Sequence, residues 1–86
     1  MFTVYSKPSC PACVEAKALL RSKDLRFTEI ILDVSQQKIQ GEKYITREAF
    51  LAILPNARTM PQVMKESDSS AVHIGGIVEL KRYLHV

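Results

Sequence analysis

Apolar and polar positions change period near the start of the chain. Residues 2–5 alternate with period two and are aromatic or β-branched at most positions, which predicts a first strand. Pro8 ends this strand in a turn, and Pro11 suits the first position of a helix, where a missing N–H costs no hydrogen bond. The inward positions that then recur at i, i+3 and i+7 are Cys13, Ala16 and Leu20. The pattern therefore predicts a strand followed by a helix of about a dozen residues.

A second strand is predicted over residues 26–32, which are mostly β-branched, aromatic or long aliphatic. Strand, helix and strand make a βαβ unit, whose two strands are expected to be parallel. The polar residues 35–44 are predicted to form a loop. Thr46 then has the side chain to cap a second helix, which Pro55 ends.

A β-hairpin is predicted near the C-terminus, from residues 62–65 and 71–74 around a turn-rich stretch at 66–70. Gly75-Gly76 ends its second strand. A last short helix follows, with apolar positions at Ile77, Leu80 and Leu84. The predicted order β-α-β-α-β-β-α is that of an α/β protein, with a four-stranded mixed sheet flanked by three helices.

Composition and charge narrow the class of protein. The chain has 86 residues, 47% of them hydrophobic, with three Gly and four Pro, so we expect residues 1–86 to form a single folded domain. The net charge of +3 is spread along the chain and does not support nucleic-acid binding. No basic leader followed by an apolar run opens the sequence, and no run approaches the roughly 20 apolar residues of a membrane span. We therefore expect a soluble, cytoplasmic monomer that does not bind membranes.

The only two cysteines, Cys10 and Cys13, are separated by two residues and stand between the predicted strand and helix. A structural disulfide is disfavoured because so short a loop removes little entropy from the unfolded chain. A zinc site is disfavoured because the further soft or imidazole donors are only His73 and His85. Redox chemistry is the leading interpretation of this C-x-x-C motif.

The predicted position of the cysteines assigns them different roles. A thiol at the start of a helix faces free N–H groups and the positive end of the helix dipole, so we expect the pKa of Cys10 to fall below the roughly 8.5 of a free cysteine. Cys13 lies one turn further along the inward stripe and is expected to be less exposed. We expect Cys10 to attack a substrate disulfide and Cys13 to resolve the mixed disulfide by attacking Cys10.

Three separate motifs carry a resemblance to a known family. They are residues 5–13 (Tyr-Ser-Lys-Pro-Ser-Cys-Pro-Ala-Cys), 59–63 (Thr-Met-Pro-Gln-Val) and 73–76 (His-Ile-Gly-Gly). In these motifs and their order the chain resembles the glutaredoxins, most of all the small glutaredoxins and glutaredoxin-like thioredoxins of phages. The resemblance runs along the whole chain and is weakest over residues 34–58. It implies the thioredoxin fold.

The resemblance also implies a set of residues around the dithiol. Pro61 would follow a cis peptide bond and face the cysteines, which turns the backbone of Met60 toward a substrate strand. Lys7 would meet the glycine carboxylate of glutathione or support the Cys10 thiolate by its charge. Tyr5 would lie beside the site, although packing explains a tyrosine at the end of a strand equally well. Other residues expected to contact substrate are Pro11, Ala12, Thr59, Ile77 and Val78.

Gly75-Gly76 follow the family pattern and would let a ligand approach the backbone. They would expose the first N–H groups of the last helix to the γ-glutamyl carboxylate of glutathione. Two other positions, Val78 and Ala12, depart from the pattern. The Asp, Ser or Thr that the family places after the glycines to meet the glutathione amino group is replaced by Val78, and Glu79 is the alternative acceptor. Ala12 stands where an aromatic ring is common between the cysteines and leaves the dithiol more open.

The sequence therefore predicts a thiol–disulfide oxidoreductase that reduces protein disulfides and glutathione mixed disulfides. Phage relatives imply ribonucleotide reductase as a protein substrate. Glutathione is the expected reductant, and the alternative is a thioredoxin reductase, a flavoprotein. A different class stays open, in which Cys10 and glutathione hold an iron–sulfur cluster at a dimer interface. We expect no metal in the oxidoreductase itself.

Overall fold

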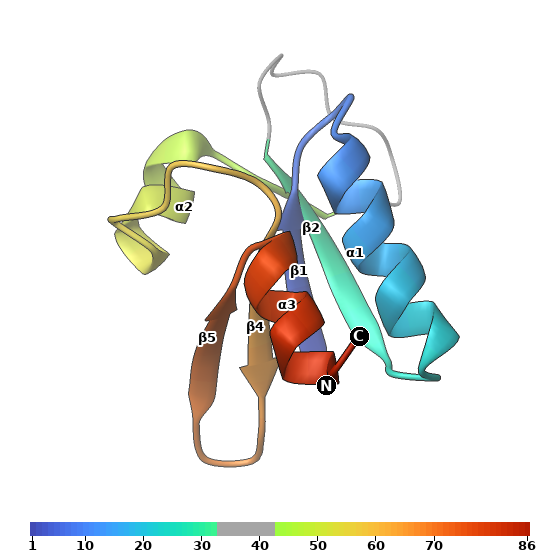
Figure 1. Cartoon of the computed structure of the whole chain (residues 1–86). Coiled ribbons are helices and arrows are strands. Elements are labelled where there is room, and N and C mark those ends of the chain that lie inside the picture. Colours follow the sequence, from blue (N-terminus) through green and yellow to red (C-terminus); the bar gives the residue numbers. More distant parts are fainter. Residues whose placement is uncertain (33–42) are drawn as a thin grey trace.

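The computed structural model describes residues 1–32 and 43–86, and its strands and helices alternate along the chain (Figure 1). The elements in order are β1 (Phe2–Ser6), α1 (Pro11–Ser22), β2 (Phe27–Leu32), β3 (Lys43–Ile45), α2 (Arg47–Ile53), β4 (Gln62–Glu66), β5 (Ala71–Gly75) and α3 (Ile77–Leu84). The predicted first strand, the helix that begins at Pro11, the C-terminal hairpin and the last helix are confirmed. None of the helices in the described ranges is long and apolar enough to cross a membrane.

The strands form one mixed sheet in the order β3-β2-β1-β4-β5. β1 pairs with β2 in parallel, as the βαβ unit predicts, and β2 pairs with β3 in parallel. β4 runs antiparallel to both β1 and β5. The central strand β1 therefore ends at the loop that carries the cysteines, directly beside the strand that begins after Pro61.

The predicted number of strands is wrong, because the sheet has five strands rather than four. Lys43 and Tyr44, which the sequence assigned to a loop, pair in β3 with Ile30 and Ile31 of β2. Three residues are too few for an alternating pattern to be recognised, and pairing with the edge of β2 defines this strand. The rest of the predicted loop, residues 35–42, lies outside the described residues.

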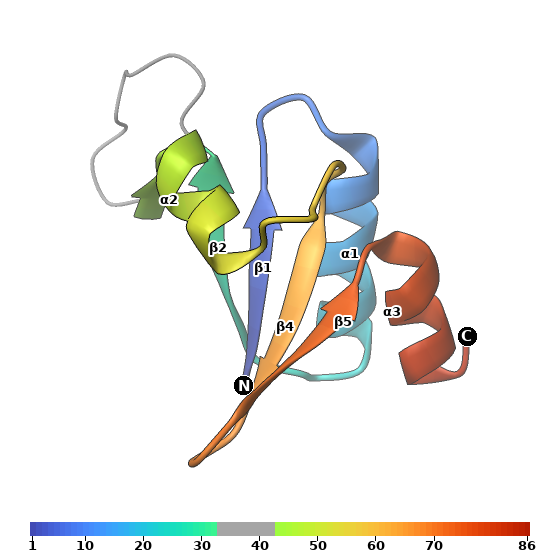
Figure 2. The same cartoon turned by 90° about the vertical axis from the view of Figure 1, so that its left-hand side faces the viewer.

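Helices cover both faces of the sheet, and each face has its own apolar core (Figure 2). α1 and α3 lie on one face, where Val4, Leu20 and Leu80 are fully buried. α2 lies on the other face, where Phe50 packs against Tyr5. Alternate residues of β1 serve the two cores, as the period of two requires. The loop after β1 is therefore held from both sides of the sheet.

Candidate active site

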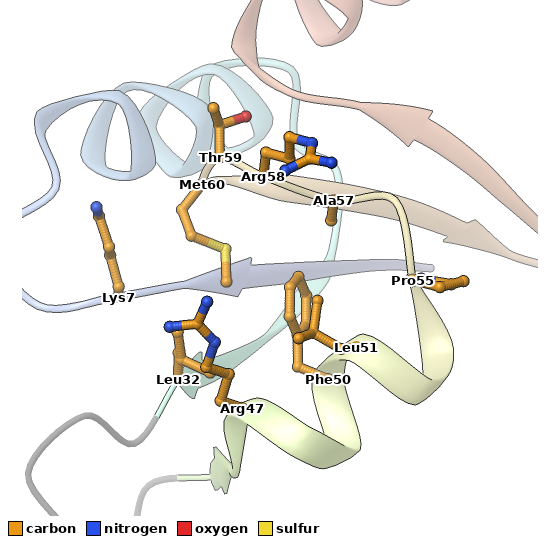
Figure 3. A pocket seen from close by; sticks show the side chains of 10 residues that line it. All are labelled: Lys7, Leu32, Arg47, Phe50, Leu51, Pro55, Ala57, Arg58, Thr59 and Met60. Atoms are coloured by element: carbon orange, nitrogen blue, oxygen red, sulfur yellow. The ribbon is translucent and has the colours of Figure 1, made fainter.

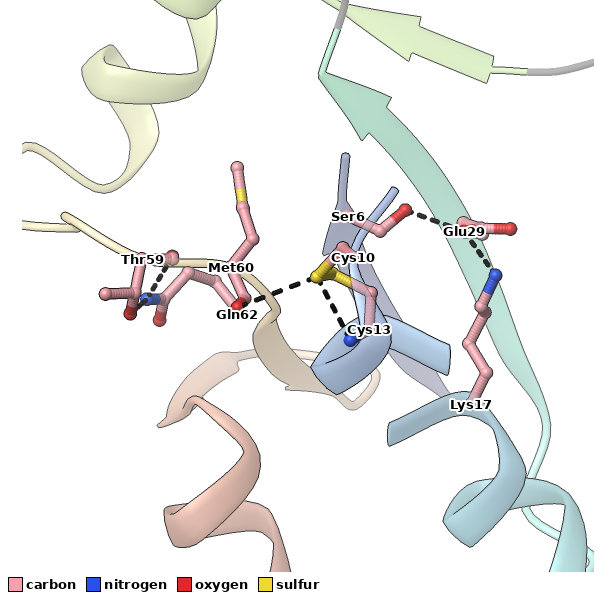
Figure 4. Close-up of a disulfide and its surroundings, with 8 residues drawn as sticks. All are labelled: Ser6, Cys10, Cys13, Lys17, Glu29, Thr59, Met60 and Gln62. Carbon is pink, nitrogen blue, oxygen red and sulfur yellow. Dashed lines mark hydrogen bonds and ion pairs between the residues drawn. A yellow bond between two sulfur atoms is a disulfide. The ribbon is translucent and has the colours of Figure 1, made fainter. Parts of the chain in front are cut away.

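The two cysteines lie at the start of α1 and are joined by a disulfide (Figure 4). Cys10 is the N-cap residue, and its Sγ accepts a hydrogen bond of 3.1 Å from the backbone N–H of Cys13. Cys10 is 8% exposed and Cys13 is 2% exposed, which confirms the predicted order of exposure. An N–H group aimed at Sγ, together with the helix dipole, stabilises negative charge on this sulfur when the disulfide is reduced.

The loop before β4 faces the dithiol, although the two segments are 50 residues apart in the sequence. The Sγ of Cys10 lies 3.8 Å from the carbonyl oxygen of Met60. A disulfide sulfur carries no hydrogen, so in this oxidised form the approach is a contact rather than a hydrogen bond. The Met60–Pro61 peptide bond is cis, as the resemblance implied, and Pro61 is fully buried.

The glycine pair forms the next wall of the site. Gly75 has a φ of +123°, which favours glycine, and a Cβ at this position would come within 2.8 Å of the Glu79 side chain. A Cβ on Gly76 would lie 3.4 Å from the carbonyl oxygen of Pro61. Gly76 therefore lies against the Met60–Pro61 loop, which itself contacts Cys10.

A cleft of about 500 Å³ opens between the loop that contains Met60 and α2 (Figure 3). Neither cysteine lines this cleft, and Met60, which does, connects it to the dithiol, because its carbonyl oxygen lies 3.8 Å from the Sγ of Cys10. Three cationic side chains line it, those of Lys7, Arg47 and Arg58, and Phe50 and Met60 contribute apolar surface. Figure 3 shows the guanidinium group of Arg47 rising from α2 toward Met60. Lys7 was predicted from the sequence, whereas the two arginines were missed. The available signal was that Arg58 directly precedes the Thr59-Met60-Pro61 motif.

The comparisons with known proteins agree with this geometry. The family model described as Glutaredoxin matches residues 2–68. The chain belongs to the glutaredoxin family. Glutaredoxins are thiol–disulfide oxidoreductases, and the Cys10–Cys13 pair of this chain fits their dithiol active site.

Individual relatives cover most of the chain. It is 36% identical to glutaredoxin 3 of Escherichia coli over 77 residues, which are 90% of the chain and 77% of that protein. It is 33% identical to glutaredoxin 1 of Rickettsia conorii, across 85% of the chain and 61% of that protein. It is 34% identical to the hybrid peroxiredoxin hyPrx5 of Haemophilus influenzae, across 94% of the chain. The chain spans 28% of that hybrid protein, so it corresponds to a part of it.

Solved glutaredoxin structures share the fold. The crystal structure of glutaredoxin 1 from Francisella tularensis, complexed with cacodylate, superposes with a TM-score of 0.68 at 26% identity, over 98% of this chain and 91% of that one. The solution structure of the Brucella melitensis glutaredoxin gives a TM-score of 0.59 at 26% identity, over 98% of this chain and 77% of that one. The chain therefore has the thioredoxin fold of the glutaredoxins.

The start of α3 differs from the arrangement expected for glutaredoxins. The Oε1 of Glu79 accepts a hydrogen bond of 2.8 Å from the backbone N–H of Gly76. This is one half of a capping box, since Gly76 has no side chain to return the second hydrogen bond. Glu79 thus occupies an N–H group that was expected to face the γ-glutamyl carboxylate of glutathione. Val78 is 54% exposed and offers no acceptor.

Tyr5 is placed in the core on the α2 side of the sheet. Its ring packs against Phe50 with the centroids 5.4 Å apart, and the residue is 7% exposed. Burial, followed by the nearby charge of Glu66, raises the pKa of Tyr5 above its ordinary value. Tyr5 stays neutral at physiological pH and supports the floor of the glutaredoxin cleft through Phe50.

An ionic network lies on the α1 side of the sheet, behind the dithiol (Figure 4). One carboxylate oxygen of Glu29 accepts hydrogen bonds from Ser6 at 2.6 Å and from Lys17 at 2.8 Å. Burial would raise the pKa of Glu29, but these hydrogen bonds and the charges of Lys17 and Arg21 hold it below its ordinary value. The network ties β1 and β2 to α1 near the cysteines, and no local pattern in the sequence predicts it.

The remaining predicted site residues take different positions. Pro11 is exposed and Ala12 is half-buried beside the cysteines. The carbonyl of Thr59 accepts a hydrogen bond of 2.8 Å from Gln62, and Ile77 packs against the core on the α1 side. Within the described ranges, no group of three or more His, Cys, Asp or Glu side chains is close enough to hold a metal ion.

Proposed function

We propose that the chain is a dithiol oxidoreductase that reduces protein disulfides, with Cys10 as the nucleophile and Cys13 as the resolving thiol. The Cys10 thiolate attacks one sulfur of the substrate disulfide, forms a mixed disulfide and releases the other substrate sulfur as a thiol. Cys13 then attacks the Sγ of Cys10 and releases the second thiol. Two electrons and two protons pass to the substrate, and the Cys10–Cys13 disulfide remains.

One observation carries this proposal, namely the position of Cys10 at the N-cap of α1. The N–H of Cys13 is directed at its sulfur from 3.1 Å. The same contact favours Cys10 as an attacking thiolate and as a leaving group when Cys13 resolves the intermediate. The Met60 backbone, 3.8 Å from the same sulfur, offers an edge on which a substrate strand can lie.

Glutathione is the reductant that we propose for the resulting disulfide. Lys7 and Arg47 line the cleft next to Met60 and are suited to a carboxylate such as that of its glycine. Protein disulfides and glutathione mixed disulfides are the proposed substrates, with ribonucleotide reductase as one such protein.

A flavoprotein thioredoxin reductase is the second candidate for the reductant. It is favoured by the start of α3, where Glu79 caps the N–H of Gly76 and Val78 has no acceptor for an amino group. These features weaken the expected contacts to the γ-glutamyl end of glutathione.

Reduction of the oxidised protein by each reductant tests the choice. Glutathione alone is compared with thioredoxin reductase and NADPH, and reduction by glutathione is the expected outcome. The reduction potential gives a second measure, because glutaredoxins lie at about −200 to −230 mV and thioredoxin at about −270 mV. Reduction by the flavoprotein alone would replace glutathione as the reductant.

Cysteine variants test the roles of the two thiols. Cys10→Ser should abolish all disulfide reduction. Cys13→Ser should keep glutathione-dependent turnover of glutathione mixed disulfides, because Cys10 alone can exchange with them, and should lose reduction of protein disulfides. Equal loss of both activities in the two variants would contradict the assignment.

A further inference from the structure

The described residues that line the cleft next to Met60 are unbalanced in charge. Lys7, Arg47 and Arg58 line it, and no Asp or Glu is among the described residues that do so. All three cations are exposed, and none forms an ion pair within the described part of the chain, where the ion pairs are Lys17–Glu29 and Lys81–Glu15. Three positively charged side chains therefore line one cleft next to Met60, and no described acidic side chain pairs with any of them.

If glutathione is the reductant, as proposed above, the cleft has more positive side chains than glutathione needs. Docked by its glycine end, glutathione brings one carboxylate into the cleft, and Lys7 with Arg47 is sufficient to meet it. Arg58 belongs to the loop that leads directly into Met60, the residue whose carbonyl lies 3.8 Å from Cys10. A substrate strand along this loop passes the Arg58 side chain on its way to the dithiol.

We propose that the Lys7–Arg47–Arg58 cleft is a docking site for an acidic segment that flanks the reducible cysteine of a protein substrate, and that Arg58 determines this specificity. Opposite charges across an interface raise the rate of association and fix the register of the partner. The floor of the cleft, formed by Phe50, Leu51 and Met60, accepts the aliphatic parts of such a segment. The acidic substrate segment is thereby distinguished from a neutral or basic one before any bond is exchanged.

Three disulfide peptides of otherwise identical sequence test the proposal, with Glu-Glu, Gln-Gln or Lys-Lys pairs flanking the cysteine. The rate constant for oxidation of the pre-reduced protein by each peptide is measured at about 0.02 M and about 0.5 M salt, because screening separates a charge effect from other contacts. The acidic peptide should react about tenfold faster than the basic one at low salt, and the ratio should fall to about twofold at high salt.

Substitution of Arg58 locates the effect. Arg58→Gln should lower the ratio of acidic to neutral rate constants about threefold, and Arg58→Lys should restore most of it. Lys23→Gln is the matched control, since it removes the same charge at the far end of α1, about 18 Å along the helix from its start, and should leave the ratio unchanged.

The two proposals fail in different ways. The docking proposal would be overturned by equal rate constants for the three peptides in the unaltered protein. It would also be overturned by equal ratios in Arg58→Gln and Lys23→Gln. In either case, reduction of the neutral peptide would still support the oxidoreductase. No reaction with any of the peptides would overturn the oxidoreductase itself.

Discussion

The two sides of the dithiol differ in charge and in how that charge is used. On the α2 side, Lys7, Arg47 and Arg58 line an open cleft and form no ion pair with another described residue. On the α3 side, the carboxylate of Glu79 is folded back onto the backbone N–H of Gly76 at 2.8 Å. One side is available for an anionic partner, whereas on the other the chain has supplied its own anion.

The difference shows how one fold can change partners without changing its chemistry. Cys10 keeps the N-cap position whatever lies on either side. Contacts on the α2 side are proposed to serve any substrate with a carboxylate, whereas those on the α3 side would decide whether glutathione is held by both ends. The following predictions alter one side at a time, from the largest expected effect to the smallest.

Removing the floor of the α2 side should have the largest effect. Phe50 is 4% exposed and packs against Tyr5, so Phe50→Ala should lower the free energy of unfolding by about 3–5 kcal/mol. Ile53→Ala, in the same helix but at a position 48% exposed, is the matched control and should cost less than about 1 kcal/mol. Urea unfolding followed by circular dichroism measures both. Similar losses in the two variants would show that the α2 core does not support the cleft.

On the α3 side, Gly75→Ala should destabilise the protein by about 1–3 kcal/mol, because of its positive φ and the overlap of the new Cβ with Glu79. Gly76→Ala is the comparison, since Gly76 has an ordinary extended backbone and the nearest contacts of its Cβ would be 3.4 Å away. The free energy of unfolding, measured in urea, should therefore be clearly lower for Gly75→Ala than for Gly76→Ala. The reverse order would contradict the close packing of the Glu79 side chain against Gly75.

A hydrogen-bond acceptor added at the start of α3 should strengthen the binding of glutathione on this side of the dithiol. In Val78→Asp, the added carboxylate can meet the glutathione amino group, and it also lies at the favourable end of the helix dipole. The rate constant for reduction of the Cys10–Cys13 disulfide by glutathione should rise about fivefold, which corresponds to about 1 kcal/mol.

Val72→Asp makes the same change at another exposed valine, on β5, and should leave this rate constant unchanged. The comparison is read by stopped-flow measurement with glutathione alone. An unchanged rate constant in Val78→Asp would mean that Val78 does not limit the use of glutathione.

The smallest effect is expected from substitution of Glu29, which belongs neither to the cleft near α2 nor to the start of α3. The quantity affected is the stability of the protein. The pKa of Glu29 is lowered in the folded protein, so its ionised form adds stability that is present above the pKa of an unfolded glutamate, about 4.3, and is lost as the pH falls through the folded value. Glu29→Gln should therefore be less stable than the unaltered protein at neutral pH, and the difference should shrink in acid.

Unfolding at about pH 7 and about pH 3 measures this difference. Asp68→Asn, which changes the net charge equally at an exposed position in the turn between β4 and β5, is the control for net charge. A difference that does not depend on pH would show that the carboxylate of Glu29 is not the source of the stability.

Local patterns were sufficient wherever neighbouring residues determine the structure. Pro11 at the first helical position and the inward stripe that ends at Leu20 predicted α1 and placed Cys10 at its start, and alternation predicted β1 and the hairpin. These features depend on residues a few positions apart. The cis bond before Pro61 came from the resemblance alone, because most bonds before proline are trans.

The sequence by itself thus determined the dithiol, its orientation on a helix and the family. Only the tertiary structure decided what surrounds it. β3 exists because β2 offers it an edge, and the cleft exists because the α2 helix and the Met60 loop bring Arg47 and Arg58 to the same space as Lys7. Such contacts join residues tens of positions apart, which no local period records. The charge of the partner is for this reason a property of the folded surface, whereas the redox chemistry is already present in residues 10–13.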